Sequence, residues 1–232
     1  DLGNPDYELA LRQPSDYTRA LQLCGLETIV LEADEGYPDS VFVEDNALLT
    51  PECAIICRPG AESRRGETES LRPVIGDYYR AVYEAKAPGT VEAGDIMMVG
   101  SHFYIGLSER TNSEGAGQLI SFLEVHGMTG STIELNDVLH LKTGVSYLEN
   151  NILLAAGEFP AKKEFQSFNI IDIDPSESYA ANCIWVNDNV LVPSGYPLTR
   201  DKIRDAGYNI IEIDVSEFRK LDGGLSCLSL RF

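Results

Sequence analysis

Short apolar runs recur along the chain, and each is followed by a polar turn and a second apolar run. Four segments share this pattern, at residues 46–60, 95–112, 145–157 and 183–195. Runs rich in Val, Ile, Leu and aromatic residues on both sides of a turn-forming pair are typical of β-hairpins. The expected turn pairs are Pro51-Glu52, Ser101-His102, Asn150-Asn151 and Asn187-Asp188. The pattern therefore predicts four hairpins, and residues 225–232 resemble a fifth copy of half the length.

Helix-like stretches separate the hairpins, and each runs into a further apolar strand. They cover residues 63–85, 113–127 and 199–207. In the second, an apolar stripe ends at Gly127, a residue that commonly stops a helix, and Thr199 is the expected N-cap of the third. The predicted unit is thus strand, strand, helix, strand.

The beginning of the chain fits the end of such a unit. Residues 6–24 read as a helix that ends at Gly25, with Pro14 expected to interrupt or kink it, and residues 27–34 read as a strand. The unit then repeats about five times. An α/β fold built from small mixed sheets in a closed ring, within a single domain over residues 1–232, is the architecture that such a repeat favours.

The residues just before the hairpins and the terminal half-copy occupy equivalent positions. They are Asp45, Asp95, His140, Asn182 and Cys227, at spacings of 50, 45, 42 and 45 residues. In a ring these side chains converge on the axis. A cysteine is a nucleophile as its thiolate, and a nearby histidine can take its proton and later protonate a leaving amine. The repeat therefore predicts a thiol active site.

The charged residues around these positions indicate the substrate. Asp45 and Asp95 would disfavour an anion and can hold a guanidinium group through paired hydrogen bonds. Arg64 and Arg110 each follow a hairpin, where they can bind a carboxylate. A cationic head with a carboxylate tail describes arginine and its derivatives.

Composition narrows the class of partner. With 37 acidic and 18 basic residues the net charge is −19, which disfavours nucleic acid, and 44% apolar residues suffice for a folded core. The odd count of five cysteines in a chain of this length indicates free thiols in a reducing compartment. No apolar run reaches the length of a membrane span. We expect a cytoplasmic protein without a membrane or nucleic-acid partner.

At the chemistry-bearing positions the chain strongly resembles the dimethylarginine dimethylaminohydrolases, a family within the guanidine-modifying enzymes of the five-bladed α/β propeller, or pentein, fold. The matching motifs run in family order from PDYELALRQ through VFVED, GLSERTN and LHLKTG to DGGLSC. The resemblance implies hydrolysis of asymmetric dimethylarginine or monomethylarginine to citrulline and an alkylamine, through a covalent thiouronium on cysteine. It implies no cofactor and no metal, and it leaves the oligomeric state open, a homodimer included.

The resemblance also assigns roles. Cys227 corresponds to the nucleophile, His140 to the general acid and base, and Asp95 to the acid that orients the histidine. The residues that correspond to substrate ligands are Asp39, Glu44, Asp45, Arg64, Arg110, Leu221 and Asp222. Of these, Asp39 matches the ligand of the α-amino group, Arg64 and Arg110 match those of the α-carboxylate, and Leu221 contributes its carbonyl.

Two departures from the family pattern stand out. Family chains begin with an extra strand and a mobile lid loop, which we expect to precede Asp1. Relatives often have histidine where this chain has Pro14, on an outer helix.

Three other hypotheses remain beside this one. An arginine or agmatine deiminase uses a similar set of residues, although such chains are longer and agmatine lacks a carboxylate for Arg64 and Arg110. The same architecture can also serve as a binding module without catalysis. A zinc site formed by Cys227 and His140 would have only two protein ligands, fewer than a structural site requires.

Overall fold

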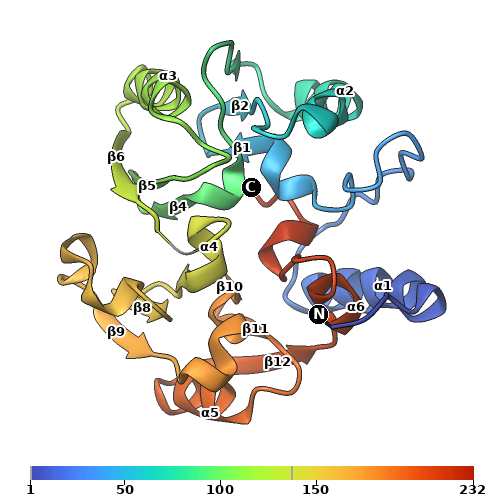
Figure 1. Ribbon diagram of the computed structural model, residues 1–232, viewed down its shortest axis with the longest axis vertical. Helices are drawn as coiled ribbons and strands as arrows, with labels where there is room; N and C mark the ends of the chain where they lie inside the picture. Colours follow the sequence, from blue (N-terminus) through green and yellow to red (C-terminus); the bar gives the residue numbers. More distant parts are fainter. Residues whose placement is uncertain (1, 137) are drawn as a thin grey trace. The chain divides into compact units, whose positions relative to one another are not determined.

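The computed structural model describes residues 2–136 and 138–232. The chain forms two compact units: unit 1 comprises Asp1–Leu31 and Thr143–Leu228, and unit 2 comprises Glu32–Lys142 and Ser229–Phe232. Each unit holds two three-stranded sheets with the same strand order, so the strand, strand, connection, strand repeat occurs four times in the described residues (Figure 1).

Unit 2 contains the first two sheets. Its strands are β1 (Ala47–Leu49), β2 (Ala54–Ile56), β3 (Val82–Glu84), β4 (Ile96–Val99), β5 (His102–Leu107) and β6 (Thr129–Glu134). In each sheet the first two strands form an antiparallel hairpin and the third pairs parallel to the second. The parallel crossovers are carried by helices, α2 (Thr68–Tyr78) in one sheet and α3 (Ser113–Glu124) in the other.

Unit 1 repeats the arrangement. Its strands are β7 (Val145–Tyr147), β8 (Ile152–Ala155), β9 (Asn169–Asp172), β10 (Ile184–Val186), β11 (Asn189–Pro193) and β12 (Asn209–Ile213). Its helices are α1 (Tyr7–Leu23), α5 (Pro197–Asp205) and α6 (Ser216–Arg219), while α4 (Leu141–Gly144) leads into β7. Between β8 and β9 two 3-10 turns, Phe159–Ala161 and Lys163–Phe165, take the place of an α-helix.

The four predicted hairpins are confirmed. The turn expected at Ser101-His102 lies one residue earlier, at Gly100-Ser101, because His102 begins β5 and pairs with Val99. Two of the other turns show why these segments form hairpins. Asn150 and Asn151 have φ of 52° and 61°, and Asn187 and Asp188 have φ of 46° and 67°. In the second turn two consecutive left-handed residues lie between the paired Val186 and Asn189, which matches the twist of a two-residue hairpin. In the first turn Glu149, with a φ of 66°, is left-handed as well, so the loop has three such residues. Asn and Asp tolerate this region better than most side chains.

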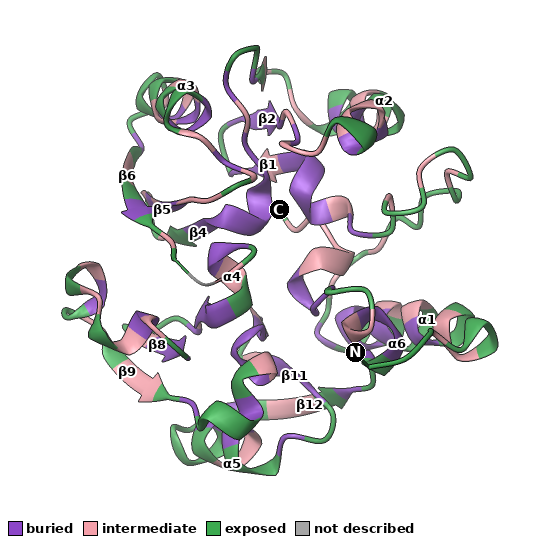
Figure 2. Cartoon of the chain, viewed as in Figure 1, coloured by how far each residue is buried: buried purple, intermediate pink, exposed green. Residues whose placement is uncertain are grey.

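Each unit has its own core (Figure 2). In unit 2, Ile55, Phe103 and Ile105 on the strands pack against Leu119 and Leu123 of α3, and all five are fully buried. In unit 1, buried residues of β8 and β11 pack against α5 and the chain before β12; they are Leu154, Val190, Val192, Ile203 and Tyr208. In these two cores the strands are covered by a connecting helix, α3 in unit 2 and α5 in unit 1.

Several predicted elements differ in extent. The helical stretch predicted over 63–85 ends at Tyr78 and is followed by β3. The helix predicted over 6–24 runs from Tyr7 to Leu23 without interruption at Pro14. One missing N–H is tolerated there because Asp6 caps the helix and Tyr17, Ala20 and Leu21 anchor its inner face.

The predicted cap at Thr199 is wrong. Helix α5 begins at Pro197, and the main-chain N–H groups of Leu198 and Thr199 donate to the carboxylate of Glu177, at 3.1 and 2.7 Å. A side chain from a preceding turn therefore satisfies the helix start.

The two strands predicted at residues 27–34 and 225–232 are absent from those described segments. Residues 27–34 form no ladder, and Ile29 and Val30 are exposed. Residues 226–228 close a 3-10 turn instead. A strand requires a hydrogen-bonded neighbour, and neither segment has one among the described strands. Within the described part of the chain, no helix combines the length and apolarity needed to cross a bilayer.

Candidate active site

The residues that precede the hairpins are buried, as the repeat predicts. Asp45 lies in the 3-10 turn Val43–Asn46, Asp95 ends the turn Ala93–Asp95, and Asn182 caps the turn Pro175–Ala181. Each turn leads into the first strand of its sheet. The exposed fractions are 3% for Asp45, 0% for Asp95, 9% for His140 and 6% for Asn182.

Unit 2 brings His140 together with acidic side chains. The His140 Nε2 atom lies 2.7 Å from a carboxylate oxygen of Glu92 and 3.9 Å from one of Asp45. Gly94 sits between Asp45 and His140: its N–H donates to Asp45 at 3.1 Å, and a Cβ there would lie 3.0 Å from the His140 ring. Only glycine leaves room for this contact between the imidazole and the carboxylates.

The acidic surroundings determine the charge of the imidazole. Burial alone would lower the pKa of His140, but the hydrogen bond with Glu92 and the charges of Asp45, Asp95 and Glu92 outweigh it and raise the pKa to about 9. Conversely, burial opposes ionisation of Glu92, yet the bond to His140 holds the pKa of Glu92 below its ordinary value. At neutral pH the pair is therefore imidazolium and carboxylate, and His140 holds a proton that it can donate.

Glu92 is the residue that the sequence analysis missed. Asp95 was the expected partner of His140, but its carboxylate instead accepts from the main-chain N–H of Leu141 at 3.0 Å and from the hydroxyl of Ser108 at 2.7 Å. Asp95 thus fixes the backbone beside His140, and Glu92 contacts the ring. The E-x-x-D spacing is an available signal, because Glu92 and Asp95 stand at the two ends of the same short 3-10 turn.

Arg64 is held by protein groups. Its guanidinium donates to Asp45 at 2.7 Å, to Glu67 at 2.8 Å and to the Phe42 carbonyl at 3.0 Å, and the residue is 7% exposed. Burial opposes its charge, but these bonds dominate and raise its pKa further. Arg64 therefore orients Asp45.

Arg110 is more accessible. Its side chain is 30% exposed, and its guanidinium lies 3.6 Å from Glu92. Glu44 is buried and forms ion pairs with Lys142 and Arg231. Asp39 is exposed. Of the two arginines expected to bind a carboxylate, Arg110 has the guanidinium that a ligand can reach more easily.

Unit 1 contains the remaining predicted site residues. Cys227 is half-buried in the 3-10 turn Ser226–Leu228, and the N–H of Gly224 donates to its sulfur at 3.4 Å. Leu221 and Asp222 lie on the exposed approach to this turn, where Asp222 has a φ of 61°. The structure thus groups Leu221, Asp222 and Cys227 on one loop.

The other four cysteines are buried, and their burial raises the pKa of each thiol: Cys24, Cys53, Cys57 and Cys183. A thiol that stays protonated is a poor nucleophile. Cys227, half-buried on its turn, is the most accessible of the five.

One cluster has a geometry that a cation can use. One ligand atom each of Asp45, Glu92 and His140 lies within 4.8 Å of the others. Metal ligation requires a neutral imidazole, so a metal ion would have to displace the proton that the raised pKa of His140 favours. The three side chains thus form a compact buried cluster of one imidazole and two carboxylates.

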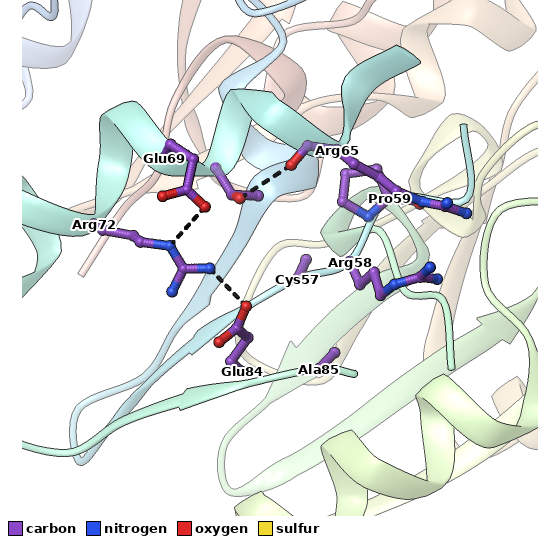
Figure 3. Close-up of a pocket in the computed structure, with 9 residues that line it drawn as sticks. Cys57, Arg58, Pro59, Arg65, Glu69, Arg72, Glu84 and Ala85 are labelled. Carbon is purple, nitrogen blue, oxygen red and sulfur yellow. Dashed lines mark hydrogen bonds and ion pairs between the residues drawn. The ribbon is translucent and has the colours of Figure 1, made fainter. Parts of the chain in front are cut away.

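A polar depression of about 150 Å³ lies elsewhere in unit 2, lined by Arg58, Arg65, Arg72 and neighbouring residues. Figure 3 shows that Arg72 is bound by Glu69 and Glu84. The depression includes none of the predicted site residues.

Comparison with known proteins identifies the family. Residues 5–229 match the family model described as N,N dimethylarginine dimethylhydrolase, eukaryotic. The chain is 62% identical to the N(G),N(G)-dimethylarginine dimethylaminohydrolase of Pseudomonas aeruginosa, with all of this chain and 91% of that protein covered. The chain belongs to the dimethylarginine dimethylaminohydrolase family. The resemblance seen in the motifs is confirmed, and with it the assignment to the hydrolases.

Further members of the dimethylarginine dimethylaminohydrolase family and its structural neighbours agree. The enzyme of that name from Streptomyces coelicolor is 34% identical over 97% of this chain and 87% of its own length. A cysteine-to-serine mutant of the Pseudomonas aeruginosa protein, solved with citrulline, superposes with a TM-score of 0.99 at 62% identity, covering 100% of this chain and 91% of that one. A histidine-to-glycine variant of a dimethylarginine dimethylaminohydrolase, solved as an adduct with S-methyl-L-thiocitrulline, gives a TM-score of 0.98, also at 62% identity over 100% of this chain and 91% of that one.

An arginine dihydrolase domain, ArgZ, matches with a TM-score of 0.89 at 22% identity, covering 98% of this chain and 87% of that one, and shows the shared fold alone. The α/β class and the repeated unit expected from the sequence are confirmed.

Proposed function

We propose that the chain hydrolyses asymmetric dimethylarginine and monomethylarginine to citrulline and dimethylamine or methylamine, with Cys227 as the nucleophile. The observation that carries the proposal is the buried pair of His140 and Glu92, 2.7 Å apart, in a family whose solved members hold citrulline and a thiocitrulline adduct. A buried imidazolium surrounded by carboxylates is suited to protonate a leaving amine.

The first half of the reaction forms the covalent intermediate. The Cys227 thiolate attacks the guanidinium carbon, so a C–S bond forms and the cationic centre becomes a neutral tetrahedral adduct. His140 gives its proton to the dimethylamino nitrogen, the C–N bond breaks, and dimethylamine leaves. A thiouronium on Cys227 and a neutral His140 remain.

The second half restores the thiolate. Neutral His140 takes a proton from water, and the oxygen adds to the thiouronium carbon. The C–S bond then breaks with the electron pair returning to sulfur, and the protonated citrulline loses its hydroxyl proton to solvent, where the dimethylamine that has left is protonated. Glu92 stabilises the imidazolium whenever His140 is protonated, as its short contact allows.

The acidic side chains explain why the proposed substrate is a cation. Asp45 is the carboxylate proposed to bind the guanidinium, and Arg64 fixes its orientation. Arg110, with its more accessible guanidinium, is proposed for the substrate carboxylate and Asp39 for the α-amino group. The Leu221 carbonyl, with Asp222 beside it in the chain, is proposed as a further substrate ligand. Glu44 keeps the loop of Asp45 in place through its ion pair with Lys142.

Steady-state assays with four substrates test the function: asymmetric dimethylarginine, monomethylarginine, arginine and agmatine. We expect the highest kcat/KM for a methylated arginine, and no citrulline formation by Cys227→Ser. A preference for arginine or agmatine would contradict the proposal and support a deiminase. Activity that survives Cys227→Ser would contradict the assigned nucleophile.

A further inference from the structure

Asn182 occupies the fourth of the equivalent positions before the hairpins, and the proposed reaction gives it no role. It is 6% exposed and follows the 3-10 turn Pro175–Ala181 directly before β10. A buried carboxamide needs partners for both its donor and its acceptor. The partners described for it lie on the turn that carries Cys227.

Asn182 binds the residue next to Cys227 twice. The main-chain N–H of Ser226 donates to Asn182 Oδ1 at 2.8 Å, and Asn182 Nδ2 donates to the Ser226 hydroxyl at 3.0 Å. Ser226 is itself 2% exposed. These two hydrogen bonds, in a buried site, fix the position and orientation of Ser226. They therefore also fix the position of the main chain at the next residue, Cys227.

Gly224 lies against the same carboxamide. A Cβ on Gly224 would come within 2.6 Å of Asn182 Cγ, so the main chain there packs directly on the amide. The N–H of Gly224 donates to Cys227 Sγ at 3.4 Å, and its carbonyl accepts from the Cys227 N–H at 3.2 Å. The backbone of Gly224 therefore contacts the amide of Asn182 on one side and the sulfur of Cys227 on the other.

The segment that contains Asn182 also binds the start of the turn that carries Cys227. The hydroxyl of Tyr179 donates to the Gly223 carbonyl at 2.8 Å. The Arg219 guanidinium lies 5.0 Å from the Tyr179 ring and 5.7 Å from the Tyr196 ring. This cation–π contact helps to hold the Tyr179 ring in position. Tyr179 and Asn182 thus hold the two ends of the turn between Gly223 and Cys227.

We propose that Asn182 is a positioning residue for Cys227: it holds the turn so that the Gly224 N–H points at the sulfur and stabilises the thiolate. A hydrogen bond to the charged form of an acid favours that form, and a fixed sulfur position favours attack. The proposal rests on the proposed function only in naming Cys227 as the nucleophile.

The test compares three variants of the full chain. Asn182→Ala removes both bonds to Ser226, whereas Ser226→Ala removes the hydroxyl and keeps the main-chain bond. Asn187→Ala is the control, because Asn187 is an asparagine of the same unit, at the exposed turn between β10 and β11, whose amide donates at 2.9 Å to the Cys24 carbonyl and not to the turn of Cys227. Thermal unfolding of each variant reports its structural cost.

The readout is the ionisation of Cys227, measured from the ultraviolet absorbance of the thiolate against pH, with Cys227→Ser as the blank. The four other thiols contribute little near neutral pH because burial raises the pKa of each. In Asn182→Ala we expect the thiolate midpoint to rise and alkylation by iodoacetamide at neutral pH to slow about tenfold. The kcat for dimethylarginine should fall by about the same factor with KM within about twofold.

Ser226→Ala should show a smaller change in the same direction, and Asn187→Ala should leave the titration and the alkylation rate unchanged. The proposal is overturned if Asn182→Ala titrates and alkylates as the parent chain does, even when its unfolding temperature falls. If Asn182→Ala does not fold, unchanged ionisation in Ser226→Ala overturns it. Failure of the proposed function is a separate result, since it would appear as no citrulline from the parent chain whereas the titration needs no turnover.

Discussion

Glu92→Gln changes the charge beside His140 while it keeps the size of the side chain. The glutamine amide oxygen can still lie next to His140 Nε2, which is 2.7 Å from the carboxylate in the parent chain. The substitution therefore removes a buried negative charge and little packing volume. Its effect on the imidazole measures how much Glu92 contributes to keeping His140 protonated.

The size of the effect follows from the local charges. The pKa of His140 is about 9 against an ordinary 6.5, which corresponds to about 3 kcal/mol in favour of the imidazolium. Burial works against the charge, and Glu92, Asp45 and Asp95 together exceed it. Glu92 supplies both a charge and the hydrogen bond, so its loss should lower the pKa of His140 by about 1 to 2 units.

NMR titration of the histidine rings measures this directly. The chain has three histidines, and a His140→Asn spectrum identifies the resonance of His140. Glu84→Gln is the matched control, because Glu84 pairs with Arg72 away from the imidazole. In Glu92→Gln the alkaline limb of kcat should move to lower pH with the ring, and kcat should fall by about 100-fold, the scale of a general acid lost. A pKa of His140 that is the same in Glu92→Gln and the parent chain would refute the reasoning.

Four further predictions follow from single contacts. Arg110→Gln should raise KM for dimethylarginine by about tenfold or more while leaving agmatine, which has no carboxylate, unaffected in steady-state assays. Arg64→Met leaves buried carboxylates unpaired and should lower the free energy of unfolding in urea by about 3 to 5 kcal/mol. Gly94→Ala places a methyl group against Asp45 and His140 and should cost about 1 to 3 kcal/mol in the same assay, with a loss of kcat. Because the folded-state pKa of His140 is raised, the stability that its protonation contributes is complete below pH 6.5 and is lost as pH rises through about 9. The free energy of unfolding should therefore fall with pH across that range, and His140→Asn should remove this fall. Equal pH dependence in the two chains would contradict the raised pKa.

The repeat and the buried positions before the hairpins could be predicted because they depend on local pattern. Alternation of apolar residues and the Asn150-Asn151 pair specify a hairpin within a dozen residues, and the structure has the left-handed φ values that such a turn requires. The equivalence of Asp45, Asp95 and His140 follows from spacing alone, and unit 2 brings these three residues together.

Features that depend on distant partners could not be predicted from the pattern. The start of α5 is capped by Glu177, 22 residues before Thr199, so no local signal marks it. Helix α1 continues through Pro14 because buried side chains hold it. Either Glu92 or Asp95 could have contacted the His140 ring. The Asp95 carboxylate accepts from the Leu141 N–H instead, which leaves Glu92 as the partner of the ring. The predicted strand at residues 27–34 has the right composition, but a strand also needs a neighbour.

The central claim is that a methylated arginine forms a covalent adduct on Cys227. Acid quenching of the parent chain during turnover of asymmetric dimethylarginine, followed by peptide mapping with mass spectrometry, tests it. The account predicts that the modification lies on the peptide containing Cys227, that it retains the amino-acid part of the substrate and that it lacks the dimethylamine. Modification of another cysteine, or turnover with only unmodified Cys227 in a chain that forms citrulline, would contradict it.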